Sequence, residues 1–126
     1  MQKMAHLGMR VTDLETSERF YKDVLNCRKS GKIENDSIRI SFVDFANGTI
    51  ELVQMMGQAE PATHGECIHL AFEVEDIEAE FERVSALGVE LIDPRPRQFN
   101  GGSLFFFKGP DGESIEFCSK IRIDPV

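Results

Sequence analysis

Four side chains that commonly bind divalent metals occupy equivalent places in the two halves of this 126-residue sequence. His6 and His69, 63 residues apart, open the similar segments HLGMRVTDLE and HLAFEVEDIE, and Glu51 and Glu116 lie in the similar segments NGTIEL and DGESIEF. Two neutral imidazoles and two carboxylates balance a divalent charge, and their donors suit zinc, nickel, cobalt, iron or manganese. The sequence therefore predicts one metal site built from these four side chains.

The alternative is that each residue is an ordinary strand residue at the surface or at the edge of the core. Successive strand side chains point to opposite faces, so His6 shares a face with Gly8 and Arg10, and His69 shares one with Glu73. A single histidine or glutamate there is a weak signal. Agreement at four repeat-equivalent positions favours the metal interpretation, because an isolated buried carboxylate needs a partner charge.

The same repeat predicts which elements position these residues. Apolar patterning predicts strands near 5–11, 38–45 and 49–55 in the first half, and near 68–74, 89–92, 103–108 and 114–119 in the second. Helices are expected to begin at Asp13 and Asp76, with helix ends near Asn26 and at Gly88. A Pro- and Gly-rich loop is expected around 93–103.

A repeat of this size predicts two stacked copies of one supersecondary unit. We expect an α+β fold of two tandem βαβββ modules that form a single domain over residues 1–126. Module 1 would span about 4–56, a linker 57–65, and module 2 about 66–120.

Composition and charge narrow the class of protein. Hydrophobic residues make up 41% and charged residues 29%, as in ordinary globular domains. The net charge of −8 disfavours nucleic acid and anionic membrane surfaces as partners. Three cysteines without CxxC spacing, Cys27, Cys67 and Cys118, favour reduced thiols over a disulfide scaffold. With no apolar run near ~20 residues and no signal core, a cytoplasmic protein is expected.

The motifs resemble those of the vicinal oxygen chelate superfamily, which includes glyoxalase I, methylmalonyl-CoA epimerase, extradiol dioxygenases, fosfomycin-resistance enzymes and bleomycin-binding proteins. The opening HLGMRVTDLETSERFYKDVLNC is similar to the family pattern, with Cys27 in place of its usual glycine, and GPDGESIEF is similar to its ending, with Gly109 in place of an aspartate. The resemblance implies a curved mixed β-sheet that forms a cavity, and its ligand order is closest to that of glyoxalase I (lactoylglutathione lyase).

The resemblance implies a metal-dependent lyase or isomerase, with nickel, cobalt or zinc as cofactor. It would convert the hemithioacetal of a 2-oxoaldehyde such as methylglyoxal and a thiol into a 2-hydroxyacyl thioester, by proton transfer through an enediolate. Glu116 or Glu51 would be the catalytic base, and the pseudo-symmetry leaves the choice open. Arg10 matches an arginine that binds the substrate, although an ion pair with its repeat counterpart Glu73 is an equal alternative.

These motifs leave the thiol and the reaction open. Bacterial glyoxalase I has an asparagine four residues after the second ligand, where this sequence has Met55; the thiol could therefore be glutathione, another thiol or a CoA-like group. A methylmalonyl-CoA epimerase-like enzyme, a thiol transferase and a non-catalytic binder of small molecules are the alternative functions. A homodimer is expected, because a short duplicated sheet leaves edges and apolar surface for a second copy to cover.

Overall fold

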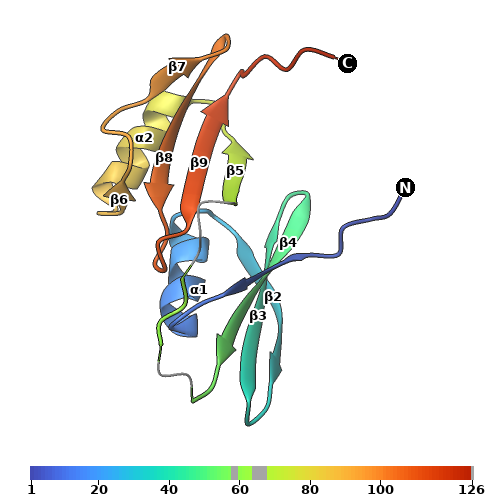
Figure 1. The fold of residues 1–126 in the computed structure, drawn as a ribbon. Helices are drawn as coiled ribbons and strands as arrows, with labels where there is room; N and C mark the ends of the chain where they lie inside the picture. Colours follow the sequence, from blue (N-terminus) through green and yellow to red (C-terminus); the bar gives the residue numbers. More distant parts are fainter. Residues whose placement is uncertain (58–59, 64–67, 126) are drawn as a thin grey trace. The chain divides into compact units, whose positions relative to one another are not determined.

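A computed structural model describes residues 1–57, 60–63 and 68–125 of the chain. The chain divides into two compact units, Met1–Thr63 and His64–Val126, each with its own sheet and helix (Figure 1). Parts of the predicted linker at 57–65, namely 58–59 and 64–65, lie outside the described residues, as do the predicted start of module 2 at 66 and Cys67.

Unit 1 is a four-stranded mixed sheet with one helix on it. Its elements are β1 (Leu7–Arg10), α1 (Leu14–Asp23), β2 (Arg28–Glu34), β3 (Ile38–Phe45) and β4 (Gly48–Met55). The strand order is β1-β4-β3-β2, with β1 parallel to β4 and the other pairs antiparallel. The order of elements is therefore βαβββ.

The helix of unit 1 begins where the sequence predicts and covers one face of the sheet. Asp13 caps it, because its carboxylate accepts a hydrogen bond from the backbone N–H of Thr16 at 3.3 Å. The helix packs against β3 and β4, where Tyr21, Val43 and Leu52 are fully buried. Because this face forms the apolar core of unit 1, side chains on the opposite face of the sheet are available for a functional site.

Strand β2 is absent from the elements predicted by the sequence pattern. Its residues, RKSGKIE, are mostly polar and exposed and lack the alternation that marks a half-buried strand. Backbone pairing with β3 supplies the missing stabilisation, with a register shift between Lys29 and Gly31. Pairing of this kind depends on the tertiary neighbour and leaves little trace in local hydropathy.

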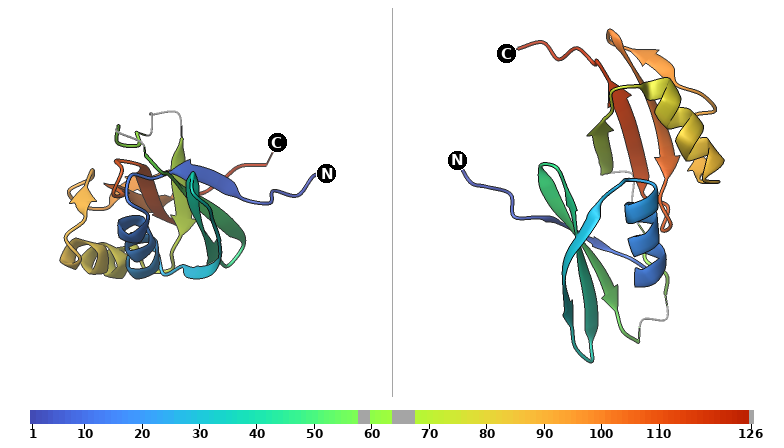
Figure 2. Two further views of the ribbon diagram at one scale, coloured as in Figure 1. Left: turned by 90° about the horizontal axis from the view of Figure 1, so that it is seen from below. Right: turned by 180° about the vertical axis from the view of Figure 1, so that it is seen from behind.

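Unit 2 repeats this plan with one strand broken in two. Its elements are β5 (His69–Glu73), α2 (Ile77–Ala86), β6 (Glu90–Leu91), β7 (Arg97–Phe99), β8 (Gly102–Lys108) and β9 (Ser114–Ser119). The strand order is β5-β9-β8-β6, β7 also pairs with β8, and β5 runs parallel to β9. Figure 2 shows α2 lying along the sheet of this unit, where it contacts β8 and β9.

Aromatic packing holds the helix-facing side of unit 2 together. The rings of Phe105, Phe107 and Phe117 lie 5.1–5.7 Å apart between centroids, and all three are buried. Asp76 caps α2 by accepting a hydrogen bond from the N–H of Ala79 at 3.0 Å, and Gly88 follows the helix with a φ of 75°. The structure confirms the predicted α+β class and the two βαβββ modules, since β6 and β7 together occupy the place of β2.

The loop predicted at 93–103 is more ordered than its Pro and Gly content indicates. Residues Arg97–Phe99 form β7, and Gly102 is the buried first residue of β8. A Cβ atom on Gly102 would lie 2.2 Å from the carbonyl oxygen of Ser119, so the glycine allows two backbones to approach closely. Gly102 is therefore needed for the close packing of β8 against the backbone of residues 119–121.

Gly102→Ala is expected to destabilise the protein by at least about 1–3 kcal/mol, because backbone atoms of 119–121 must shift to admit the methyl group. Gly48→Ala is the matched control, since no atom lies within 4 Å of a Cβ built there. Urea unfolding monitored by circular dichroism measures both variants. Equal unfolding midpoints for the two would contradict the close packing.

Neither helix of the described residues is long and apolar enough to cross a membrane.

Candidate functional site

In unit 1, the sheet face opposite the helix holds one histidine–glutamate pair. The Nε2 atom of His6 lies 3.3 Å from Oε2 of Glu51. Glu51 is in the middle of β4, and Gly8 of β1 lies directly opposite it in the parallel register. A Cβ on Gly8 would lie 3.6 Å from the Glu51 carboxylate, so a small residue keeps room for this side chain. The carboxylate is mostly buried, with 19% of its side chain exposed.

Unit 2 contains the same arrangement at the repeat-equivalent positions. The Nε2 atom of His69 lies 3.1 Å from Oε1 of Glu116, and the glutamate side chain is 13% exposed. Ala71 takes the place of Gly8 opposite the glutamate, so the neighbour is again small. The structure thus brings the predicted residues together as two pairs, one in each unit.

The donor atoms of each pair fit a divalent metal. Metal–nitrogen and metal–oxygen bonds of about 2.0–2.2 Å at angles of 90–109° separate two adjacent donors by about 3.0–3.4 Å. The observed separations of 3.3 Å and 3.1 Å lie within this range. In residues 1–57, 60–63 and 68–125, no three His, Cys, Asp or Glu side chains gather into one group, so each unit by itself supplies two donors.

An aromatic ring contacts each histidine edge-on, which the sequence patterns alone do not predict. Phe42 contacts His6 edge-on at 6.0 Å between centroids, and Phe106 contacts His69 at 5.4 Å. Phe42 and Phe106 lie opposite Glu51 and Glu116 in their sheets. Only the equivalence of the two phenylalanines is visible in the sequence, because Ile-Ser-Phe-Val and Leu-Phe-Phe-Phe place a phenylalanine at the same point of each repeat.

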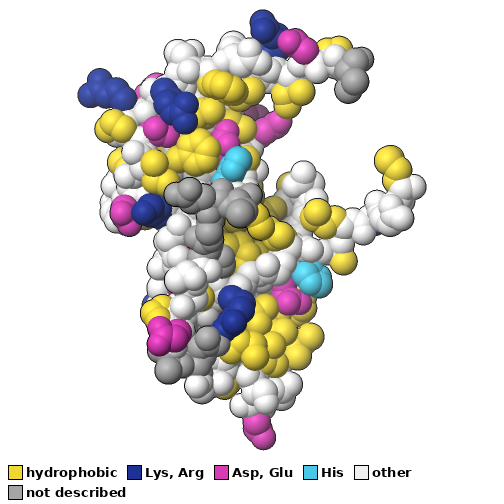
Figure 3. Space-filling model, in the orientation of Figure 1, with side chains coloured by type: hydrophobic (Ala, Val, Ile, Leu, Met, Phe, Trp, Pro, Cys, Tyr) yellow, Lys and Arg dark blue, Asp and Glu magenta, His cyan; other side chains and the backbone are white. Residues whose placement is uncertain are grey.

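The face that carries the unit 1 pair is largely apolar around Glu51 and toward Met55, with Arg10 at the end of β1 and Asp44 and Thr49 at its other end. The register places on this face Ile33 of β2, Ile38 and Ile40 of β3, and Val53 and Met55 of β4. Figure 3 shows hydrophobic side chains gathered over these strands beside a histidine and an acidic group. Polar ligands surrounded by apolar side chains are typical of small-molecule sites, because the few polar groups orient the ligand.

Arg10 extends from the end of β1 on this same face. It pairs in register with Val53, two residues beyond Glu51. Its side chain lines a pocket of about 160 Å³ together with Gln54, Met55 and Pro61. The predicted substrate-binding arginine and the methionine at the family's asparagine position therefore border one pocket of unit 1.

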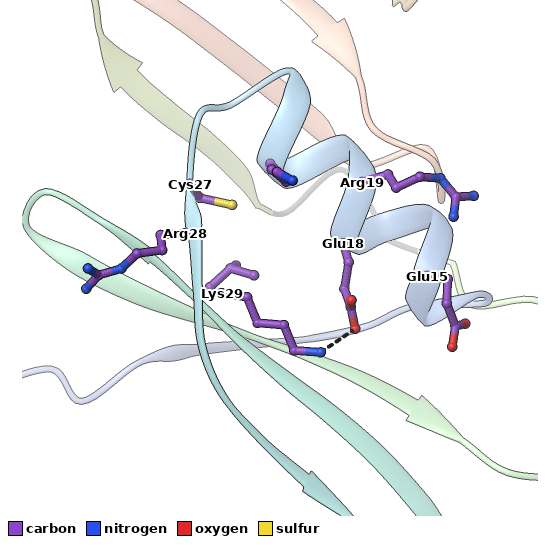
Figure 4. Close-up of a pocket in the computed structure, with 8 residues that line it drawn as sticks. Glu15, Glu18, Arg19, Cys27, Arg28 and Lys29 are labelled. Atoms are coloured by element: carbon purple, nitrogen blue, oxygen red, sulfur yellow. Dashed lines mark hydrogen bonds and ion pairs between the residues drawn. The ribbon is translucent and has the colours of Figure 1, made fainter.

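A second pocket of unit 1, of about 500 Å³, lies on the helix side of the sheet (Figure 4). Its lining includes Val43 and Cys27, and burial raises the pKa of the Cys27 thiol to about 11. Lys29 and Glu18 also line this pocket, and Nζ of Lys29 donates to the Glu18 carboxylate at 3.2 Å. Because Val43 points away from the face of Phe42 and Glu51, this pocket is separate from the histidine–glutamate pair.

Cys118 lies on the face of Glu116 but is poorly suited to be a nucleophile. Burial raises the pKa of its thiol, and the carboxylates of Glu116 and Glu73 raise it further. The thiol group donates to the carbonyl of Phe72 at 3.6 Å. A protonated thiol is a weak nucleophile, which supports a packing role for this cysteine.

Comparison with known proteins places this chain in a family. The model of the Glyoxalase/Bleomycin resistance protein/Dioxygenase superfamily matches residues 3–117. The chain belongs to this superfamily, as its motifs predict. It is 34% identical to the uncharacterized protein YwbC of Bacillus subtilis, over 94% of this chain and 98% of that protein.

Relatives with named activities point to more than one reaction. The chain is 34% identical to lactoylglutathione lyase of Haemophilus influenzae, over 91% of this chain and 90% of that enzyme. It is 26% identical to metallothiol transferase FosB of Staphylococcus epidermidis, over 88% and 77%. The trypanothione-dependent glyoxalase I of Leishmania major shares the fold, with a TM-score of 0.81, 24% identity and coverage of 95% and 88%.

Proposed function

We propose that the protein is a metal-dependent enzyme of the glyoxalase I type, and that His6, Glu51, His69 and Glu116 hold one divalent ion. The observation that carries this proposal is the similar spacing of the donor atoms in the two histidine–glutamate pairs, 3.3 Å in unit 1 and 3.1 Å in unit 2. Nickel, cobalt or zinc is the expected ion, because nitrogen and carboxylate donors suit these metals.

The reaction proposed is conversion of a 2-oxoaldehyde–thiol hemithioacetal into a 2-hydroxyacyl thioester, as in methylglyoxal detoxification. A bound divalent ion would polarise the substrate's carbonyl oxygen as a Lewis acid. One of the two glutamates would take the proton from C1 and return it to C2, and the other would remain a ligand. A positioned carboxylate that transfers a proton in this way contributes about 10²–10⁴ in rate.

Other residues of the same faces would orient the substrate and exclude water. Arg10 would pair with an anionic part of the thiol from its place two residues beyond Glu51. Phe42 and Phe106 would hold the imidazoles in place through their edge-on contacts. The apolar side chains around Glu51 would keep water from the carbon that exchanges its proton.

A second candidate is a thiol transferase or an epimerase that uses the same four ligands. The similarity to metallothiol transferase FosB favours the transferase, although the identity is lower than that to the lyase. Because Met55 stands in place of the glutathione-binding asparagine, the identity of the thiol is open for both the lyase and the transferase. A non-catalytic binder is less well supported, because a binder has no need of four donors at repeat-equivalent positions.

The test loads purified protein separately with nickel, cobalt and zinc, and measures bound metal together with thioester formation. Methylglyoxal is supplied with glutathione, a bacillithiol-like thiol or CoA. We expect close to one ion per four-ligand site and turnover with at least one thiol. Folded protein that takes up none of the metals would contradict the site. Metal-loaded protein that is inactive with every thiol would contradict the lyase and leave the transferase or epimerase.

We also propose that the protein is cytoplasmic and that its active form is a homodimer, because a second copy can cover exposed apolar side chains of unit 1 such as Ile33 and Met55. Light scattering on the metal-loaded samples measures the assembly. Monomer alone at micromolar concentration would argue against the dimer.

A further inference from the structure

Arg97 of β7 lies on the same face of unit 2 as the His69–Glu116 pair. It pairs in register with Leu104, which is two residues before Phe106 on β8. Leu104 and Phe106 therefore share a face, and Phe106 is directly opposite Glu116. The Cζ atom of Arg97 lies 5.9 Å from the centre of the Phe106 ring. One aromatic ring thus contacts both the guanidinium and the His69 imidazole.

The orientation of this guanidinium is set by Asp93. Its Oδ1 atom accepts from Nε of Arg97 at 3.2 Å, and its Oδ2 atom accepts from the backbone N–H of Phe106 at 2.8 Å. Asp93 is mostly buried and is itself held by the strand that carries Phe106. The aspartate therefore fixes the arginine with respect to the metal-binding face and acts as a positioning residue.

This arrangement leaves the outer edge of the guanidinium open. Within residues 1–57, 60–63 and 68–125, neither Nη amino group of Arg97 donates to another protein group. An arginine held on its Nε side by a carboxylate and on its face by a ring can still offer two parallel N–H donors. Such a pair matches the two oxygens of a carboxylate, phosphonate or phosphate.

The two units differ in charge at this position. In unit 1 the residue at the equivalent register position is Ile33, which pairs with Ile40 two residues before Phe42. In a chain of net charge −8, a guanidinium at this register position of unit 2, where unit 1 has an isoleucine, is a specific feature. It would attract an anionic group to the His69 side and repel a cationic one.

We infer that Arg97 is a specificity-determining residue whose Nη groups bind a terminal oxyanion, a carboxylate or a phosphonate, of the substrate held at the histidine–glutamate site. The inference rests on the proposed function for the position of the rest of the substrate. Binding of a simple oxyanion by Arg97 itself requires no metal, and the two ideas can therefore be tested separately.

The first experiment titrates metal-free protein with inorganic phosphate and follows the arginine Nε–H signals by NMR. We expect the Arg97 signal to shift, and the accompanying shifts of the Phe106 ring to disappear in Arg97→Gln. Arg95→Gln is the matched control, because it removes the same charge from the same segment while Arg95 has no partner among the described residues. It should leave the Phe106 shifts intact. No phosphate-dependent shift of Arg97, or equal loss in both variants, would overturn the inference.

The second experiment compares two chelating hydroxamates with metal-loaded protein, identical except that one ends in a carboxylate and the other in a carboxamide. Wild-type protein should bind the carboxylate about 10–100-fold more tightly, as expected for hydrogen bonds to a charged group. Arg97→Gln should bring the two affinities close together, and Arg95→Gln should not. Undiminished preference in Arg97→Gln would overturn the inference. If no metal is bound and neither hydroxamate binds, the proposed function fails, while the phosphate titration still decides the role of Arg97.

Discussion

Replacement of His69 by alanine is expected to lower the affinity for nickel, cobalt or zinc by more than about 100-fold, because loss of a ligand should exceed the 10–100-fold cost of losing a ligand's supporting partner. Glu116→Gln should also reduce metal occupancy, since an amide is a weaker and neutral donor. In both variants, turnover of the hemithioacetal should fall at least in proportion to bound metal. Metal analysis after dialysis, with activity measured on the same samples, gives both quantities.

Glu75→Gln is the control for these variants. It removes one negative charge from an exposed position of unit 2, two residues beyond the end of β5. Its metal content and activity should match those of the wild type, which separates ligand loss from a change in net charge. Circular dichroism and urea unfolding report whether each variant is folded. Unchanged metal content in folded His69→Ala would exclude this histidine as a ligand.

Glu51→Gln and Glu116→Gln are expected to differ in their effects on catalysis, although the repeat makes the two glutamates look equivalent. One must serve as the base, and its loss should lower kcat by about 10²–10⁴ while more of the metal remains bound. The other mainly holds the metal, so its loss should appear first as lower metal affinity. Turnover at saturating metal, compared with metal affinity, distinguishes the two roles.

The physical reason for this difference is the unequal charge around the two pairs. Arg10 lies two residues along the face from Glu51, whereas Glu73 occupies the equivalent place in unit 2 and Arg97 lies at the other end of that row. A chiral anionic substrate should therefore present its C1 proton to one particular glutamate. Identical losses of kcat and of metal affinity in the two variants would contradict this asymmetry.

Arg10 provides an independent readout of the same asymmetry. Arg10→Ala should raise KM more than it lowers kcat, because the arginine would bind the ground state and the transition state about equally. A large fall in kcat with unchanged KM would instead place Arg10 among the groups that act on the reacting atoms.

The fold class and the candidate ligands could be predicted from the sequence, because the repeat is visible in short stretches of residue types. Asp13 and Asp76 predict the helix starts, because an aspartate side chain can accept a hydrogen bond from a backbone N–H of the first turn. Strand alternation predicts which neighbours share a face with each histidine. The βαβββ modules and the four candidate ligands follow from comparing the halves. These features depend on residues close together in the chain, so periodicity and motif spacing are enough to predict them.

Other features arise only when distant segments pair. The polar strand β2 exists because β3 offers it backbone partners, and the edge-on contact between Phe42 and His6 depends on the pairing of β3 with β4. The position of Arg97 could likewise not be predicted, because a Pro-rich segment is typical of a solvated loop. Pairing of β7 with β8, together with the anchoring of Asp93 to the N–H of Phe106, turns this arginine onto the His69 face. Hydrogen bonds between segments far apart in sequence decide such placements, and residue types within a short window do not contain that information.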